Sequence, residues 1–342
     1  MDHWVRVGAT SFLTAAICVP VARKLALRGK LLDIPNERSS HAIPKPRIGG
    51  VGIVLGALLG CAAAYGESTF SFSSKELLLL LLLAALSFVG LADDIWQLSV
   101  SKRMPLYLLF SFLLVLFCYR ATSLQVLLFS WSLPTAVSIV FSTLFLAWYT
   151  NLFNFMDGVD GIAAGAAIVT LNALALVFFQ NESQPLSYIA LSLAGASAGF
   201  LFYNFPPASV FMGDVGSVFL GAASGALTLA AIELNYLSIV AGVLLMFPFV
   251  FDASFTLARR ALNGEKVWRA HRSHIYQQMG DLGISHRVVT LSYSVLAFLC
   301  AAFGLLYDSM TLRGQLGGLT LLIALSGGGA FLVLSRARAN HS

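Results

Sequence analysis

Long apolar runs recur along almost the whole chain, and they constrain the fold more than any other feature. A helix needs about 20 residues to cross a hydrocarbon core about 30 Å thick. Composition agrees with a membrane location, because 58% of the residues are hydrophobic and 11% are charged, whereas soluble domains have about 45–50% and about 25%. The sequence therefore predicts an all-α, polytopic integral membrane protein.

We count about eleven candidate spans and expect a single transmembrane catalytic domain over residues 1–342. The expected spans are 4–22, 49–66, 76–92, 104–121, 134–150, 162–180, 186–204, 217–233, 236–256, 288–306 and 315–334. A cleaved signal peptide is the competing interpretation of residues 1–22. It is disfavoured because the basic cluster follows the apolar run, whereas a signal peptide carries that cluster in front.

Lysine and arginine are distributed unevenly between alternate loops. Seventeen of the 21 fall in one set, and cytoplasmic loops carry such an excess. This bias predicts an amino terminus outside and a carboxyl terminus inside the cell. It also explains the basic pI without nucleic-acid binding, for which no basic patch interleaved with aromatic residues is found. The expected cytoplasmic loops are about 23–48, 93–103, 151–161, 205–216 and 257–287.

Five aspartates lie at the cytoplasmic ends of expected spans: Asp93, Asp94, Asp157, Asp160 and Asp214. Carboxylates are costly near a bilayer and by default mark a site for an ion, a substrate or a proton. Asp93 and Asp94 point about 100° apart on a helix. One can therefore reach a ligand while the other braces a neighbour or a metal, unless the pair simply ends the helix at the water interface.

The stretch "NLFNFMDGVDG" carries a polar residue at every third position: Asn151, Asn154, Asp157 and Asp160. On an unbroken helix each step of three drifts by about 60°, so the first and last would face opposite ways. Gly158 and Gly161 permit backbone conformations closed to other residues. We therefore expect a bend that gathers these polar groups round a small cavity, which membrane proteins tolerate where the bend lines a protected site.

The stretch "YNFPPASVFMGDVGSVFLG" predicts a helix start after two prolines, with Ser217 as its cap. Asp214 stands there between Gly213 and Gly216. A carboxylate beside free backbone N–H groups suits a phosphate held through Mg²⁺, which typically takes one or two protein carboxylates. The alternative is an ordinary glycine-rich turn between helices.

Two basic loops complete the set of candidate residues. In the loop 257–287, His271, Arg272 and His274 could clamp a pyrophosphate, or the loop could only attract anionic lipid. The loop "DIPNERSSHAIPKPRIGG" adds Lys45 and Arg47, with a topology signal as the alternative. Two interpretations of the membrane-embedded Asp252 stay open: it positions the "HRSH" loop, or it is a buried polar contact between helices.

Together these segments resemble the successive signatures of the polyprenyl-phosphate N-acetylhexosamine-1-phosphate transferases. "DIPNERSSHAIPKPRIGG", "ADD", "NLFNFMDGVDGIAAG" and "FMGDVGSVFLG" come in that family's order, and the resemblance covers essentially the whole chain. The chain looks most like the branch that initiates O-antigen and related glycans. It departs from the peptidoglycan branch, which has three consecutive histidines where this chain has "HRSH", so a muramoyl-pentapeptide substrate is disfavoured.

The resemblance implies that undecaprenyl phosphate attacks a UDP-N-acetylhexosamine and releases UMP, at the cytoplasmic face of a bacterial inner membrane. It implies Mg²⁺, or Mn²⁺ in its place, on Asp214 and Asp157. Asp93 would orient or deprotonate the lipid phosphate, with Asp94 supporting it or the metal. Asn154 and Asp160 would hold the nucleotide, and Phe211 would stack on uracil. Direct displacement is favoured over a covalent phospho-aspartate, and a homodimer is left open.

Two other functional classes were weighed against this one. A proton-coupled transporter of lipid-linked or nucleotide sugars would share the composition, but its aspartates should lie near mid-membrane, often in repeated halves, and no repeat is found. A synthase of phospholipids that uses CDP-alcohols would need D-G-x-x-A-R, whereas residues 157–162 read "DGVDGI".

Overall fold

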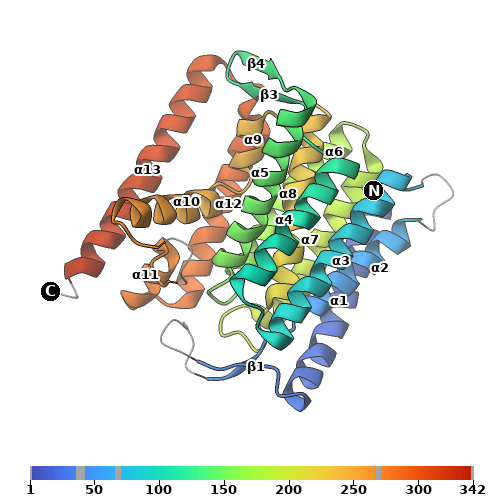
Figure 1. Ribbon diagram of the computed structural model, residues 1–342, viewed down its shortest axis with the longest axis vertical. Helices are drawn as coiled ribbons and strands as arrows, with labels where there is room; N and C mark the ends of the chain where they lie inside the picture. The colour runs from blue at the N-terminus through green and yellow to red at the C-terminus, as the bar shows by residue number, and fades with distance from the viewer. Residues whose placement is uncertain (1, 36–42, 66–70, 267–270, 340–342) are drawn as a thin grey trace.

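The protein is a bundle of helices with two short β-hairpins at opposite ends (Figure 1). The structure is a computed structural model that describes residues 2–35, 43–65, 71–266 and 271–339. The helices are α1 (Asp2–Arg28), α2 (Gly50–Tyr65), α3 (Ser74–Trp96), α4 (Val100–Phe117), α5 (Thr135–Met156), α6 (Ile162–Gln180), α7 (Gln184–Asn204), α8 (Asp214–Glu233), α9 (Ile239–Leu244), α10 (Phe247–Leu262), α11 (Ile275–Asp281), α12 (His286–Tyr307) and α13 (Leu312–Ala339). The hairpins pair β1 (Leu32–Asp33) with β2 (Lys45–Pro46), and β3 (Ser123–Val126) with β4 (Phe129–Ser132).

The expected class, an all-α polytopic membrane protein, is confirmed. In the part of the chain that the structure describes, nine helices are long and apolar enough to cross a membrane, and α2 is a shorter apolar helix. The total of eleven spans and their orientation stay predictions. The region around Trp131, which precedes the expected fifth span, forms the β3–β4 hairpin.

The ninth expected span, 236–256, is not one helix. α9 ends at Leu244 and α10 begins at Phe247, with Pro248 in its first turn. Proline has no N–H to donate, and its ring collides with the carbonyl four residues earlier, here that of Leu244. The chain breaks here into two helices, so the expectation of a single helix over 236–256 was wrong. Figure 1 shows α10 lying across the direction of the long helices.

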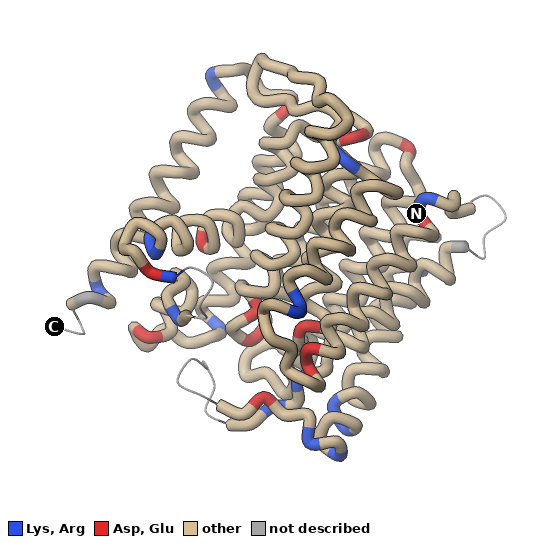
Figure 2. Tube along the Cα trace, in the orientation of Figure 1, with Lys and Arg blue, Asp and Glu red and all other residues tan. Residues whose placement is uncertain are grey.

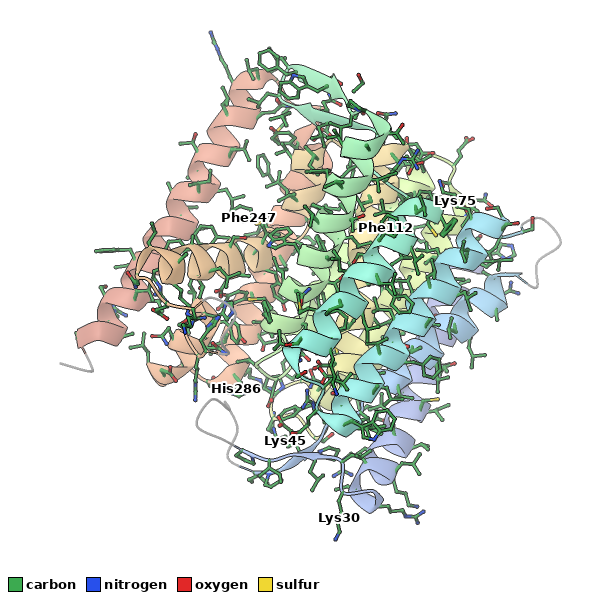
Figure 3. All side chains as sticks on the ribbon, in the orientation of Figure 1. Lys30, Lys45, Lys75, Phe112, Phe247 and His286 are labelled. Carbon is green, nitrogen blue, oxygen red and sulfur yellow. The ribbon has the colours of Figure 1, made fainter. Side chains whose placement is uncertain are left out.

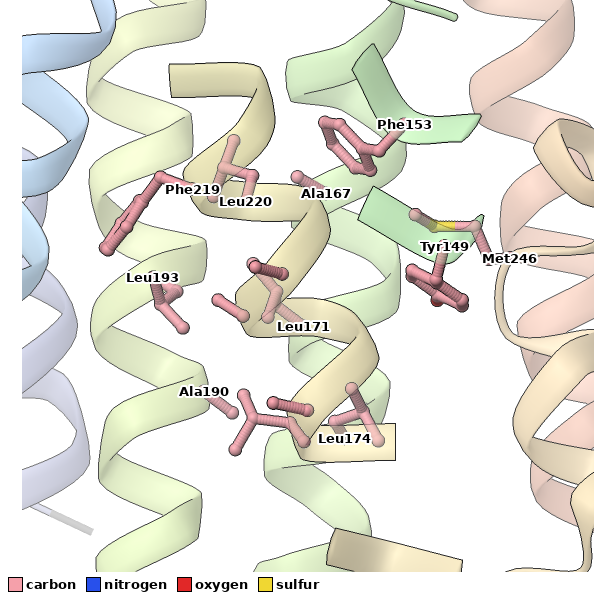
Figure 4. Packing of buried hydrophobic residues seen from close by; sticks show 14 of the residues in the cluster. Tyr149, Phe153, Ala167, Leu171, Leu174, Ala190, Leu193, Phe219, Leu220 and Met246 are labelled. Carbon is pink, nitrogen blue, oxygen red and sulfur yellow. The ribbon is translucent and has the colours of Figure 1, made fainter. Parts of the chain in front are cut away.

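The helix at the centre of the bundle is α8, in which every residue from Asp214 to Ile232 is buried. Its many glycines and alanines let neighbouring helices come close, the packing on which helix association in lipid depends. A Cβ at Gly221, for example, would lie 2.8 Å from the Cβ of Phe153 on α5. Figure 4 shows Phe153, Leu171 and Leu193 in this core, contributed by α5, α6 and α7.

Charged residues gather at one end of the bundle. Figure 2 shows a group of acidic and basic residues at the lower end of the central helices. Figure 3 places Lys30, Lys45 and His286 near this end and Lys75 near the other. The end of α3 and the beginning of α8, which are far apart in sequence, meet there. The sites marked by separate sequence motifs are thus brought to one face of the molecule.

The chain around β2 runs beside the segment that precedes α8. The N–H of Phe211 donates to the carbonyl oxygen of Pro46 at 2.8 Å, and the N–H groups of Gly49 and Gly50 donate to the carbonyls of Phe211 and Met212 at 2.9 and 2.8 Å. These backbone bonds fix the first basic loop against the start of α8.

Gly213 is the residue at which this packing is closest. Its φ is +72°, and a Cβ there would lie 2.1 Å from the carbonyl oxygen of Arg47 and 2.6 Å from a carboxylate oxygen of Asp94. Only glycine satisfies both the backbone conformation and the available space.

A labelling experiment tests the orientation. Leu128, in the β3–β4 turn, is 74% exposed, and Arg28, at the end of α1, is exposed on the opposite side. We expect a membrane-impermeant maleimide to label Leu128→Cys in intact cells and Arg28→Cys only after permeabilisation. The wild-type chain, whose Cys61, Cys118 and Cys300 are buried, gives the background. Labelling of Arg28→Cys alone from outside would invert the topology.

A glycine pair tests the packing at the start of α8. Gly213 and Gly264 both have a positive φ, of +72° and +73°, but nothing lies within 4 Å of a Cβ built at Gly264. Alanine at either position is strained by roughly 1–3 kcal/mol, and only Gly213→Ala adds a collision. We therefore expect a larger fall in the melting temperature of the detergent-solubilised protein for Gly213→Ala than for Gly264→Ala. Equal falls would contradict the close packing described here.

Candidate functional site

The Asp94 carboxylate, at the end of α3, caps the beginning of α8. It accepts the backbone N–H groups of Asp214 and Val215, each at 2.9 Å, and Arg47 Nε lies 2.9 Å from its Oδ1. The first N–H groups of a helix have no partner within it and form its positive end. Asp94 therefore braces a neighbouring helix, one of the two tasks expected of the aspartate pair.

Ser217 does not cap α8, so that expectation was wrong. The helix begins three residues earlier, at Asp214, and the Ser217 hydroxyl donates to the carbonyl of Gly213 at 3.1 Å. Because Asp94 of α3 supplies the cap of α8, no residue close to Asp214 in the sequence indicates where that cap comes from.

Asp93 turns away from Asp94 and pairs with Arg103 on α4. Arg103 Nη1 lies 2.7 Å from Asp93 Oδ2 and 3.3 Å from Asp214 Oδ2. On the other side, Arg47 Nη2 lies 3.0 Å from Asp214 Oδ1. The Asp214 carboxylate thus stands between two guanidinium groups, and ion pairs join α3, α4, α8 and the first basic loop.

Asp160 forms a second group, in the turn between α5 and α6. Its Oδ2 accepts the N–H of Ala208 at 2.8 Å and lies 3.4 Å from Lys45 Nζ and 3.6 Å from His286 Nδ1. Burial opposes ionisation of this carboxyl, but the bonds from His286 and Ala208 and the charge of Lys45 hold its pKa below the usual value. Lys45 Nζ also lies 4.9 Å from the centre of the Phe211 ring. Three predicted nucleotide-binding residues are thus adjacent.

The bend expected in residues 151–161 is confirmed, because α5 and α6 are separate helices. Gly161 has a φ of +79° and donates its N–H to Asn204 Oδ1 at 2.8 Å. Asn154 donates to Ser217 Oγ at 3.0 Å and so faces α8. Asn151 instead donates to the carbonyl of Ala147 in its own helix, at 2.7 Å, so it does not join the gathered polar groups as expected.

Asp157 follows the end of α5 and donates its backbone N–H to the carbonyl of Asn154 at 3.2 Å, but its carboxylate makes no hydrogen bond or ion pair with any residue that the structure describes. Burial, together with the charges of Asp214 and Asp94, raises its pKa well above the usual carboxyl range. These three aspartates and Asp93 are offset by the two guanidinium groups alone, and this excess of negative charge suits a cation.

The residues fit Mg²⁺ by the chemistry of their donors. Mg²⁺ prefers oxygen ligands and usually takes one or two protein carboxylates, with water and phosphate oxygens completing its octahedron. Asp214 and the unpaired Asp157 would supply them. Within the described residues no three histidine, cysteine or acidic side chains are placed to bind one metal.

Asp252 holds the loop that carries the "HRSH" motif. Its 1% exposed carboxylate accepts the N–H groups of Ile275 and Tyr276 at 2.9 and 3.0 Å and lies 3.1 Å from His274 Nδ1. Tyr293 donates a further bond from α12, at 2.5 Å. Of the two interpretations left open, the structure favours the first, because Asp252 caps α11 and orients His274.

The three residues of the predicted clamp have different surroundings. His274 is 3% exposed, and its ring centre lies 4.9 Å from that of His271. Burial and the neighbouring positive charges lower the pKa of His271 to about 4, so this ring is neutral near pH 7. Arg272 Nη2 lies 2.8 Å from Asp281 Oδ1. None of the bonds described for these three reaches the aspartate cluster, and the clamp stays a prediction.

One contact ties this loop to the segment at the end of α5. The Tyr276 hydroxyl donates to the carbonyl oxygen of Phe155 at 3.0 Å, and a Cβ at Gly158 would lie 2.1 Å from the same hydroxyl. The "HRSH" loop therefore adjoins the turn that carries Asp157.

Sequence reasoning missed three residues of this face: Arg103, Asn204 and His286. Arg103 had a signal, since it follows the aspartate pair by ten residues on the expected cytoplasmic side. His286 and Asn204 had none, because only the fold brings them to the turn between α5 and α6.

An apolar groove of about 440 Å³ runs between α4 and α5 on the outer surface of the bundle. Pro105, Leu108 and Phe112 line it from α4, and Val140 and Leu144 line it from α5. Figure 3 marks Phe112 on this face. Pro105, the first groove residue on α4, follows Arg103 by two residues and so lies on a different face of the helix. The groove is an apolar surface of the kind that suits lipid.

Comparison with known proteins gives a consistent match. The family model of glycosyl transferase family 4 matches residues 77–232. A probable undecaprenyl-phosphate N-acetylglucosaminyl 1-phosphate transferase of Bacillus subtilis is 28% identical, over 88% of this chain and 84% of that protein. A decaprenyl-phosphate N-acetylglucosaminephosphotransferase of Mycobacterium tuberculosis is 29% identical, over 83% and 78%.

A phospho-N-acetylmuramoyl-pentapeptide-transferase of Clostridium beijerinckii is 27% identical, over 85% of this chain and 91% of that protein. All three similar proteins are thus matched over most of their length, and the family match itself covers the "ADD", "NLFNFMDGVDG" and "FMGDVGS" segments that build the site. The chain thus matches the model of glycosyl transferase family 4 over its central part and is similar over most of its length to polyprenyl-phosphate N-acetylhexosamine-1-phosphate transferases.

Proposed function

We propose that the protein transfers an N-acetylhexosamine-1-phosphate from a UDP-sugar to undecaprenyl phosphate and releases UMP. The observation that carries the proposal is the cluster of Asp93, Asp214, Arg47 and Arg103 at one end of a bundle of long apolar helices. Such a site can hold a phosphate whose lipid tail stays in the membrane. The similar proteins from Bacillus and Mycobacterium are named for transfer to undecaprenyl and decaprenyl phosphate.

Charge repulsion is the main obstacle to this reaction, because an anionic acceptor must approach an anionic diphosphate. A phosphate oxygen of the acceptor forms a bond to the β-phosphorus of the UDP-sugar, and the bond from that phosphorus to the bridging oxygen breaks, so that UMP leaves. Arg47, Arg103 and Lys45 supply fixed positive charge where the negative charge accumulates. Mg²⁺ held by Asp214 and Asp157 would supply further Lewis-acid stabilisation of the diphosphate.

Asp93 is placed to orient the acceptor rather than to act as a strong base. A lipid phosphate is already largely ionised at neutral pH, with a second pKa of about 6 by analogy with phosphoamino acids. Asp93 shares Arg103 with Asp214, so it fixes the guanidinium that faces the acceptor. We therefore favour direct displacement over a covalent phospho-aspartate.

We assign the donor nucleotide to the second group of residues. Lys45, Asp160 and Phe211 lie together there, and Asn154 binds Ser217 in the first turns of α8. An aromatic ring offers a face on which uracil can stack. His271, Arg272 and His274 would close over the diphosphate from the loop that Asp252 holds.

The setting follows from the same chemistry. We place the site at the cytoplasmic face of the bacterial inner membrane, where UDP-sugars are available, and assign the product to O-antigen or a related surface glycan. A homodimer stays a prediction. The transporter alternative gains no support, since the aspartates lie at one end of the bundle.

A turnover assay tests the proposal directly. Purified protein supplied with undecaprenyl phosphate and a panel of UDP-N-acetylhexosamines should release UMP only when both substrates are present. A transporter would release none. Release that needs the UDP-sugar alone would indicate hydrolysis and would contradict the transfer.

Replacement of one carboxylate tests the metal assignment. Asp214→Asn keeps the shape of the side chain and removes its charge, so we expect a fall in kcat of roughly 10²-fold or more through lost metal and phosphate stabilisation. Asp308→Asn is the matched control, because Asp308 follows the far end of α12 and only binds the N–H of Ser238. Near-normal activity of Asp214→Asn across a Mg²⁺ titration would refute the assignment.

A further inference from the structure

Tyr107 is a buried residue of the charged cluster to which the proposed mechanism gives no task. It lies on α4, one helical turn after Arg103, and is 2% exposed. Residues four apart lie on the same face of a helix, so its side chain follows that of Arg103. Its hydroxyl has no hydrogen-bond partner among the described residues.

Three other buried tyrosines near charged groups have a hydrogen-bond partner. Tyr119 donates to Glu76, Tyr276 to the carbonyl of Phe155, and Tyr293 to Asp252. A buried hydroxyl without a partner carries a free-energy cost, which a ligand that accepts its hydrogen bond would remove.

The surroundings of the hydroxyl indicate which kind of ligand fits. It lies within electrostatic range of Asp214, Arg103 and Asp93. Those carboxylates are already engaged by Arg47 and Arg103. A neutral donor beside a guanidinium suits one more anionic oxygen, because it adds a hydrogen bond without adding a charge.

The position on α4 separates the two substrates. Arg103 and Tyr107 lie on one face of α4, and Arg103 pairs there with Asp93 of α3, which the proposed mechanism assigns to the acceptor. The group formed by Lys45, Asp160 and Phe211 is built from the first basic loop, the turn after α5 and the segment before α8. We therefore assign the side of the cluster that α3 and α4 form to the phosphate of the lipid substrate.

We propose that the Tyr107 hydroxyl donates a hydrogen bond to a phosphate oxygen of the polyprenyl phosphate acceptor, next to Arg103. Tyr107 thereby binds and orients the acceptor and does not contact the UDP-sugar. This inference rests on the proposed transfer reaction.

The experiment compares Tyr107→Phe with wild type in steady-state kinetics, with undecaprenyl phosphate and UDP-N-acetylglucosamine varied in turn. A lost bond to a charged group should raise the KM for undecaprenyl phosphate roughly tenfold, equivalent to about 1.4 kcal/mol. The KM for the UDP-sugar and the half-saturating Mg²⁺ concentration should change less than about twofold.

Tyr307→Phe is the matched control. Tyr307 is also buried, at 1% exposed, and its hydroxyl also has no partner among the described residues. It lies at the end of α12 opposite to His286, so its loss should leave all three constants unchanged.

Two outcomes would overturn the inference. An unchanged KM for undecaprenyl phosphate in Tyr107→Phe would show that the hydroxyl does not contact the acceptor, and a change confined to the UDP-sugar or Mg²⁺ would assign Tyr107 to the donor side. Tyr107→Met repeats the test with different packing, should the first variant fail to fold. Absence of turnover in wild type would instead refute the transfer reaction itself.

Discussion

The bond between the Asp94 carboxylate and the first N–H groups of α8 is the interaction on which the rest of the site depends. It joins the end of one membrane helix to the beginning of another, more than 100 residues away in the chain. The first turn of α8 lies deep in the bundle, where uncapped N–H groups would be costly. The same carboxylate fixes Arg47, and through Arg47 the position of Asp214.

Glycines allow α3 and α8 to come close enough for the bond between Asp94 and the first N–H groups of α8. A Cβ at Gly90 would lie 2.4 Å from the carbonyl oxygen of Asp214, and one at Gly50 would lie 2.4 Å from the Cα of Gly216. The contacts between the charged side chains therefore require that the backbones of α3, α8 and the first basic loop approach closely. The charged network is a consequence of small-residue packing, because bulkier side chains would hold α3, α8 and the first basic loop apart.

The sequence predicted the features that depend on residues close together in the chain. Apolar length gave α6 its observed bounds, 162–180, and the glycines of "DGVDG" indicated the bend after α5. Pro248 is a local signal for the break between α9 and α10. The apolar run continues through this proline, however, so the sequence was interpreted as one span. What could not be predicted comes from contacts between distant segments. These are the capping of α8 by Asp94, the approach of His286 to Asp160, and the four donors that Asp252 gathers from residues 274–276 and from Tyr293. No spacing in the chain encodes those distances.

The sharing of Arg103 between Asp93 and Asp214 has a consequence for how the site fills. Both carboxylates occupy the same nitrogen of the guanidinium, so the strongest positive group on α4 is already neutralised before any substrate arrives. An incoming phosphate must compete for Arg103, and as it does so it loosens the hold on Asp93. Binding of the phosphate to Arg103 and release of the Asp93 carboxylate from Arg103 are thus one exchange of ion-pair partners. Until the substrate binds, the aspartates occupy the position on Arg103 that its phosphate takes.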